Sequence, residues 1–232
     1  MLRGVFFDMG GTLVIYEGGD DPWRASVLEA IEREFGERWW AEPLYSADIR
    51  RPPADDPYRQ ETERWLAEWL QARGAVLDTD QIARLRRAFA RPLPPAFGLA
   101  TGAADAFAWC HASHLTVAVL TNTLSRGDAE VREDFQGLGL DHFVDHVVTS
   151  YSTGWEKPHP AMFKRALAEA GIAASEACMV GDDLELDVAG AKGVGMRAIW
   201  VRAGAVAATH NARPDLEIQS LRELPDALGR WL

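Results

Sequence analysis

Short apolar runs that alternate with helical patterns constrain the fold of this 232-residue chain more than any other feature. The first run ends at Phe7, and one of the helical patterns occupies 160–171, with Gly171 as its stop. Because strands that alternate with helices form parallel sheets covered on both faces, the sequence predicts an α/β fold with a Rossmann-like parallel sheet. The later runs are 115–122, 146–150, 178–183, 197–201 and 216–220.

Residues 18–95 break this rhythm, because they contain helical patterns and no comparable apolar run. Asp-Pro pairs at 21–22 and 56–57 are typical helix starts, and Asp78 with Gln81 has the spacing of a capping box. We therefore predict a helical domain inserted after the first strand, with residues 1–17 and 96–232 forming the α/β core domain. The three expected helices fall within 21–36, 56–74 and 78–95.

The inserted helices carry many tryptophans. On helical stripes, large aromatic side chains favour packing in a core over contact with a ligand. Two adjacent tryptophans are harder to bury together, so one of Trp39 and Trp40 is expected to face the crevice between the domains. The others are Trp23, Trp65 and Trp69.

The charge balance narrows the range of partners. The formal net charge is −11, and no run rich in Lys or Arg is present, so the footprint expected for nucleic acid or an anionic membrane is missing. A signal-peptide core and a stretch of about 20 apolar residues are also missing, which predicts a cytoplasmic protein. Cys110 and Cys178 have apolar neighbours and are expected to be buried. We expect a small-molecule partner and a monomer or homodimer.

Polar residues follow the apolar runs at four places. In an open parallel sheet the carboxyl ends of the strands converge on one crevice, where ligands bind. We therefore expect these polar residues to form one site. They are Asp8, Thr121-Asn122, Lys157-Pro158 and Asp182-Asp183 with Asp187.

These residue types suit a phosphate and a divalent cation. Two or three carboxylates can hold Mg²⁺ through oxygen and leave coordination places for a phosphate. The Thr121 hydroxyl can donate to phosphate oxygens, and Lys157 can balance charge and keep Asp8 ionised. An ionised Asp8 could then attack phosphorus and form an aspartyl-phosphate.

Four segments, in order and spacing, resemble the motifs of the haloacid dehalogenase-like hydrolase superfamily. They are "DMGGTL" at 8–13, "LTN" at 120–122, "KPHPAMF" at 157–163 and "VGDDLELDVAGAKGVGM" at 180–196. The last is the most specific, and the helical insertion stands where the family has its type 1 cap. The resemblance implies the family's α/β core with a cap domain at 18–95.

The resemblance also implies roles, position by position. Asp8 resembles the nucleophile and first metal ligand, and Gly10 the residue whose backbone carbonyl binds the metal. Thr121 and Asn122 match the phosphate-binding positions, with Thr121 as a catalytic hydroxyl. Lys157 resembles the charge-balancing lysine, which is both catalytic and phosphate-binding. Asp182 resembles the direct Mg²⁺ ligand, and Asp183 and Asp187 its supporters.

One position departs from the family's pattern. Its phosphatases have a second aspartate two residues after the nucleophile, which protonates the leaving oxygen and then activates water. Here that position is Gly10. General acid–base help contributes typically about 10²–10⁴ in rate, so turnover is expected to be slow or to favour good leaving groups. Glu17, Asp20 and Asp21 follow closely enough to be considered as substitutes.

The sequence thus predicts a Mg²⁺-dependent phosphohydrolase for a small phosphorylated metabolite, acting through an aspartyl-phosphate. Two alternatives stay open. One is a non-catalytic protein that keeps the Mg²⁺ and phosphate pocket. The other is a relative that cleaves a carbon–halogen or carbon–phosphorus bond, although residues 18–95 contain no lysine for a Schiff base.

Overall fold

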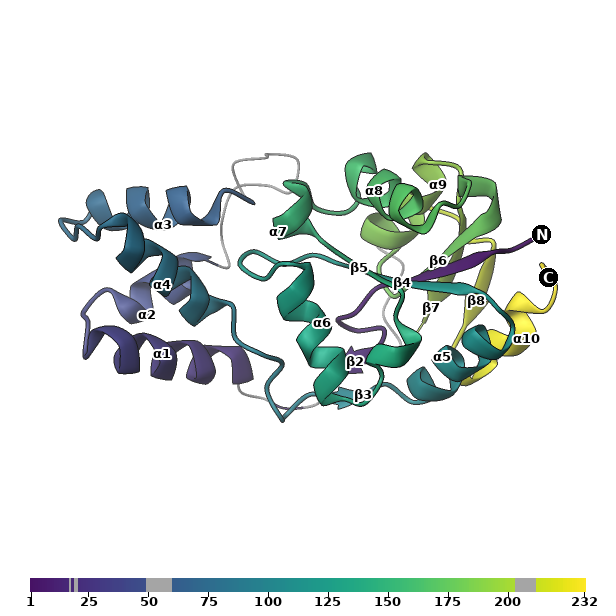
Figure 1. The fold of residues 1–232 in the computed structure, drawn as a ribbon, viewed down its shortest axis with the longest axis horizontal. Coiled ribbons are helices and arrows are strands. Elements are labelled where there is room, and N and C mark those ends of the chain that lie inside the picture. The colour runs from purple at the N-terminus through teal and green to yellow at the C-terminus, as the bar shows by residue number, and fades with distance from the viewer. Residues whose placement is uncertain (17, 19–20, 49–59, 203–211) are drawn as a thin grey trace.

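Six strands form one parallel sheet in the computed structural model, which describes residues 1–16, 18, 21–48, 60–202 and 212–232 (Figure 1). The strand order is β5-β4-β1-β6-β7-β8. This sheet confirms the predicted α/β fold, and each predicted apolar run contains a strand. The strands are β1 (Gly4–Phe7), β4 (Thr116–Thr121), β5 (His146–Thr149), β6 (Ala177–Gly181), β7 (Arg197–Val201) and β8 (Leu216–Ile218).

Helices cover both faces of the sheet, as its sequence pattern requires (Figure 1). Successive side chains of a strand point to opposite faces, so in β1 Val5 and Phe7 pack on one apolar cluster and Phe6 on the other. The first cluster lies under α5, α6 and α10, and the second under α8 and α9. These helices are α5 (Ala103–Ala112), α6 (Asp128–Gly137), α8 (Pro160–Ala170), α9 (Gly190–Gly193) and α10 (Leu224–Leu228).

Shorter helical turns connect these elements. The short helix α7 follows β5 directly, and a six-residue π-helical turn follows β6. The connecting turns are α7 (Ser150–Thr153), Asp141–Phe143, Ala174–Glu176, Leu184–Ala189 and Leu221–Glu223.

Four further helices pack together as a separate lobe, to the left in Figure 1. Their apolar side chains form a cluster of their own, in which Ile31, Leu66 and Leu85 have no exposed surface. Two predicted helix starts are confirmed: Asp21 caps α1, and Asp78 with Gln81 forms the capping box of α4. The helices are α1 (Pro22–Phe35), α2 (Ala41–Asp48), α3 (Thr62–Gln71) and α4 (Thr79–Phe89).

The expectation of three inserted helices is wrong, because α2 lies between the first and second of them. This helix has only eight residues, includes Pro43 and directly follows the Trp39-Trp40 pair, so it has too few turns to give a clear apolar period. The predicted start of α3 at Asp56-Pro57 lies outside the described residues.

The chain leaves the core and returns to it through a short antiparallel pair of strands. Strand β2 (Val14–Ile15) pairs with β3 (Gly98–Leu99), and the Ala100 amide donates to the Leu13 carbonyl at 2.9 Å. The sequence did not reveal this pair, because two-residue strands are too short to show a period. The domain boundaries at 17/18 and 95/96 stay a prediction.

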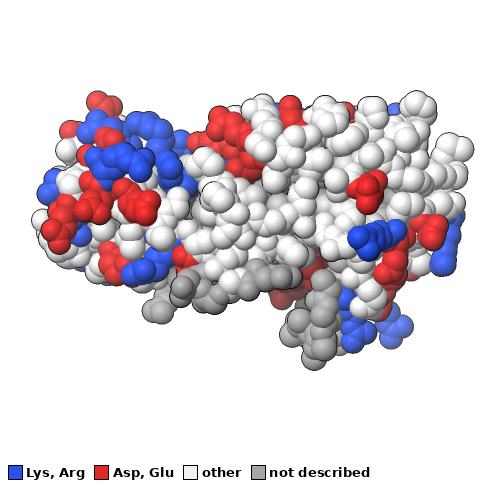
Figure 2. Space-filling view, turned by 90° about the horizontal axis from the view of Figure 1, so that it is seen from below, with Lys and Arg blue, Asp and Glu red and all other residues white. Residues whose placement is uncertain are grey.

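The surface carries charges of both signs. In Figure 2, charges of both signs mix over the inserted lobe, and the middle of this face is largely uncharged. None of the helices in the described part of the chain combines the length and the apolar character that crossing a bilayer requires.

Candidate active site

The sheet brings three of the predicted residues to one edge. Strand β1 lies between β4 and β6, with Phe7 in register with Val119 on one side and Val180 on the other. Asp8 follows β1 directly, Thr121 is the last residue of β4, and Asp182 follows the end of β6. These positions lie where the chain order reverses within the sheet, which is where open α/β sheets bind ligands.

Three carboxylates meet at this edge. Asp8, Asp182 and Asp187 each offer an oxygen, and these oxygens all lie within 4.8 Å of one another. Asp8 and Asp187 are buried, whereas Asp182 is exposed. Oxygen donors at this spacing are the ligands that Mg²⁺ prefers.

Lys157 is buried between two of these carboxylates. Its Nζ lies 2.5 Å from an Asp8 oxygen and 2.7 Å from an Asp187 oxygen. Only 2% of Lys157 is exposed, a degree of burial that lysine reaches almost only in ion pairs. Burial alone would lower the pKa of Lys157, but the charges of Asp187 and Asp8 outweigh it and raise that pKa. The ammonium therefore stays protonated.

The carboxylates that gather here repel one another. Although Asp182 is exposed as a residue, partial desolvation of its carboxyl group, and then the negative charge of Asp8, raise its pKa. Burial likewise raises the pKa of Asp187, although Lys157 opposes the change. One lysine does not compensate three carboxylates, so the charge of the site favours a bound cation.

The turn after Asp8 supports Asp182. The Thr12 hydroxyl donates to an Asp182 oxygen at 3.0 Å. Gly11 adopts a φ of +84°, which favours glycine, and a Cβ there would lie 2.4 Å from Asp182 Oδ2 and displace that carboxylate. Gly10 differs, because a Cβ there would have nothing within 4 Å.

The predicted phosphate residues lie beside this cluster but differ in their contacts. Thr121 and Asn122 both line the adjoining cavity. The Asn122 side chain accepts from the Lys157 amide at 2.8 Å and donates to the Lys157 carbonyl at 3.1 Å. Asn122 thus fixes the segment that presents Lys157.

The two predicted supporting aspartates also have different contacts. Asp187 is buried against Lys157 and accepts from the Asp183 amide at 3.2 Å. The Asp183 side chain instead accepts from the amides of Glu185 and Leu186, both at 2.8 Å. Asp183 therefore caps the turn Leu184–Ala189, which carries Asp187.

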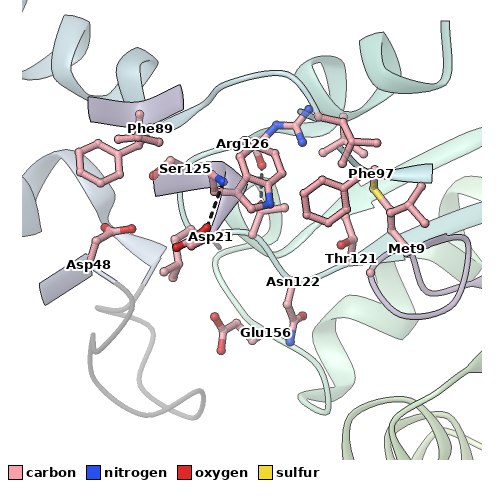
Figure 3. A pocket seen from close by; sticks show the side chains of 18 of the residues that line it. Met9, Asp21, Asp48, Phe89, Phe97, Thr121, Asn122, Ser125, Arg126 and Glu156 are labelled. Carbon is pink, nitrogen blue, oxygen red and sulfur yellow. Dashed lines mark hydrogen bonds between the residues drawn. The ribbon is translucent and has the colours of Figure 1, made fainter. Parts of the chain in front are cut away.

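A cavity of about 760 Å³ adjoins the cluster and extends to the inserted helices (Figure 3). Core residues such as Gly10 and Thr121 line one part of it, and cap residues such as Trp23 and Phe89 line another. Of the tryptophans, Trp23 lines it. Trp40 is instead buried in the inserted lobe, and Trp39 is 65% exposed, so the expectation that one of this pair faces the crevice is not met.

Three polar residues of the cavity wall were not found from the sequence. Both Arg126 and Glu156 are buried and line the cavity. Arg126 follows Asn122 closely and Glu156 directly precedes Lys157, so the residues that flank each motif were the signal that could have identified them. Asp48, also buried, ends the unpredicted helix α2. Of the considered acids, Asp21 lines the cavity, whereas Glu17 and Asp20 lie outside the described residues.

Cap side chains hold the loop that follows β4. Arg86 of α4 donates to the Ser125 carbonyl at 2.7 Å and pairs with Glu130 of α6 at 2.9 Å. The Thr62 hydroxyl donates to the Leu124 carbonyl. The inserted lobe therefore contacts the segment that begins with Thr121.

Comparison with known proteins identifies the family. Residues 2–195 match the haloacid dehalogenase-like hydrolase family. A ribulose-1,5-bisphosphate 5-phosphatase from Halopiger xanaduensis is 30% identical over 99% of this chain and 100% of its own. A phosphoserine phosphatase from Thermus thermophilus is 42% identical over 47% of this chain, and the match spans only 43% of that protein.

A solved structure agrees on the fold. A 2-haloacid dehalogenase from Pseudomonas syringae pv. Tomato superimposes with a TM-score of 0.67 over 100% of both chains, at 24% identity. At this identity the likeness concerns the fold alone. The match over residues 2–195 and the relative from Halopiger confirm the resemblance predicted from the four motifs: the chain belongs to the haloacid dehalogenase-like hydrolase family.

Proposed function

We propose that this protein is a Mg²⁺-dependent phosphohydrolase that acts on a small phosphorylated metabolite through an aspartyl-phosphate at Asp8. The observation that carries the proposal is the meeting of three carboxylates and a buried lysine at the switch point of the sheet. The relatives from Halopiger and Thermus are named as phosphatases, which supports this reaction class.

The proposed chemistry starts with an ionised Asp8. The ammonium of Lys157 lies 2.5 Å from an Asp8 oxygen and holds this carboxylate in place for in-line attack on phosphorus. Phosphoryl transfer depends mainly on positioned positive charge around the equatorial oxygens. Lys157 supplies one such charge, and the Thr121 hydroxyl at the end of β4 can donate to a phosphate oxygen.

The residues present fit a Mg²⁺ ion. Asp8 and Asp182 would hold it, together with the backbone carbonyl of Gly10. Asp187 would support the site from behind, because it is buried and its pair with Lys157 fixes the lysine that also contacts Asp8. When bound, the ion would neutralise the repulsion that raises the pKa of Asp182 and would polarise the phosphoryl group.

We assign different functions to the two proposed domains. Residues 1–17 and 96–232 would provide the chemistry, and the cap at 18–95 would close over the substrate and exclude water. The absence of an aspartate at Gly10 predicts slow protonation of the leaving group. A cytoplasmic location and a monomeric or homodimeric state also stay predictions.

The test measures Mg²⁺-dependent phosphate release from 4-nitrophenyl phosphate and a panel of phosphorylated metabolites. The wild type is compared with Asp8→Asn, which keeps an oxygen ligand but removes the nucleophile. Activity that needs both Mg²⁺ and Asp8 is expected. Release that persists in Asp8→Asn would overturn the proposal.

The glycine at position 10, where the family's phosphatases have their acid–base aspartate, supports a second candidate function: binding of Mg²⁺ and phosphate without turnover. It predicts Mg²⁺-dependent phosphate binding by the wild type and no release from any ester in the panel. Halide release from a 2-haloacid that does not need Mg²⁺ would instead favour carbon–halogen chemistry.

A further inference from the structure

A second concave site lies on the inserted lobe and shares no described lining residue with the cavity beside Asp8. Helices α1 and α4 line a pocket of about 150 Å³, which we call the arginine groove. Two of its lining residues, Ala30 and Ala88, are small and buried, so they leave the hollow between the helices open. The others are Arg33 and Glu34 of α1, Arg84 and Arg87 of α4, and Arg91, which follows α4.

The charge of the arginine groove is not balanced. Among the described residues, four guanidinium groups and one carboxylate line it. Arg84 Nε lies 2.7 Å from Glu34 Oε1, so that carboxylate is already paired. In the described part of the chain the side chains of Arg33, Arg87 and Arg91 form no ion pair and no hydrogen bond. Like charges gathered in one hollow repel one another, so three unpaired cations favour a bound anion.

The helix dipole accounts for only part of this cluster. Arg33 lies in the last turn of α1 and Arg87 in the last turn of α4, where cations are stabilised. Arg91 lies beyond the helix, and its Nε is shielded from solvent without an acceptor among the described residues. Buried N–H groups nearly always have an acceptor. The groove therefore presents donors that its own residues leave unused.

The arrangement of these donors fits a phosphoryl group better than a carboxylate. A guanidinium offers N–H donors in a planar fork, and one such fork already takes both oxygens of a carboxylate. A phosphoryl group has three terminal oxygens and can accept from guanidiniums that come from separate segments, as they do here. The volume is below the range of about 300–1,000 Å³ typical of sites for drug-sized ligands, so the enclosed group is compact.

We infer that the arginine groove is a second anion site, which binds a compact phosphate ligand of the size of pyrophosphate. The inference goes beyond the proposed function and does not depend on it, because the groove lies apart from the carboxylate cluster. Figure 2 shows basic side chains gathered on the inserted lobe, although the chain as a whole carries a net charge of −11.

The test is calorimetry with inorganic pyrophosphate in the presence of EDTA. Without a metal the catalytic site presents three carboxylates and one lysine, so it competes poorly for an anion. Arg33→Glu and Arg87→Glu each reverse one exposed charge, on different helices. The control Arg222→Glu makes the same change in net charge at an exposed position of the turn Leu221–Glu223, beside α10 at the other end of the molecule (Figure 1).

We expect the wild type to bind pyrophosphate with a Kd below about 1 mM. Each groove variant should bind at least about tenfold more weakly, because a charge-assisted hydrogen bond is replaced by repulsion. Arg222→Glu should change the Kd by less than about twofold, since solvent and salt screen a distant surface charge. In NMR spectra, pyrophosphate should shift the amide signals of Ala30 and Ala88 and leave those of Gly10 and Asn122 in place.

Each of the other outcomes contradicts the inference. They are no binding by the wild type, equal weakening by Arg222→Glu, and amide shifts confined to Gly10 and Asn122, which would place the anion in the catalytic site. Tighter binding of tricarballylate, a carboxylate anion of about the same charge, would overturn the choice of phosphate. Because the measurements involve neither Mg²⁺ nor turnover, their failure is distinct from a failure of the proposed phosphohydrolase.

Discussion

Replacing Gly10 with aspartate should convert a slow phosphohydrolase into a faster one. The structure permits the change, because Gly10 is exposed, its φ is not left-handed, and a Cβ there would have nothing within 4 Å. We therefore expect the free energy of unfolding to change by no more than about 0.5 kcal/mol, as for most surface substitutions. The new carboxylate would enter the cavity that Gly10 lines.

The expected gain is that of a general acid–base catalyst. A positioned proton donor contributes typically about 10²–10⁴ in rate, or about 2.7–5.4 kcal/mol of transition-state stabilisation. Good leaving groups need less protonation, so the gain should be larger for an alkyl phosphate than for 4-nitrophenyl phosphate. The assay is steady-state phosphate release from both esters, at saturating Mg²⁺.

Two neighbouring variants serve as controls. Gly10→Asn has the same shape as the aspartate but cannot transfer the proton, so its turnover should stay near that of the wild type. Gly11→Ala tests whether the turn after Asp8 supports Asp182. The φ of +84° should make alanine destabilise the fold, and the added Cβ, 2.4 Å from Asp182 Oδ2, should displace that carboxylate and weaken Mg²⁺ binding. If Gly10→Asp leaves turnover unchanged or lower, the missing-acid reasoning is wrong.

The α/β core could be predicted from the sequence because the patterns that indicate its strands are local and recur along the chain. Each strand of the main sheet is an apolar run, and the residue types at the strand ends are unusual enough to stand out. The carboxylates could be placed together because parallel strands bring their carboxyl ends to one edge, and Lys157 reaches the same edge although helix α7 separates it from the end of β5.

The wall of the cavity was less accessible to sequence reasoning, because it joins residues from both lobes. Trp23 lies on a helical stripe and looks like a core residue, yet it lines the cavity. Asp48 ends a helix too short to show a period. The role of Asn122 depends on a contact with Lys157, 35 residues away, which no local pattern indicates.

Three further predictions test the site and the contact between the lobes. Lys157→Met leaves two carboxylates without their cation, so urea titration should show a loss of about 3–5 kcal/mol in the free energy of unfolding, partly restored by Mg²⁺; an unchanged value would contradict the ion pairs. The pKa of Asp182 in the folded protein is raised above 3.8, so without metal the free energy of unfolding should fall as pH rises through that pKa. Mg²⁺ affinity should increase over the same pH range, because the ionised carboxylate is the ligand. Urea denaturation with and without Mg²⁺ should therefore give pH profiles that are not parallel. Arg86→Ala removes cap contacts with the loop after β4, so KM should rise by a larger factor than kcat falls; a loss confined to kcat would argue against a role in cap closure.

The most direct test of the account is to trap the covalent intermediate on Asp8. Because Gly10 offers no base to activate water, the aspartyl-phosphate from an activated aryl ester should accumulate. Acid quenching with ³²P-labelled 4-nitrophenyl phosphate and Mg²⁺ should label the wild type at the Asp8 peptide, with the label released by hydroxylamine and absent from Asp8→Asn. Phosphate release by both proteins, with label on neither, would contradict nucleophilic catalysis by Asp8.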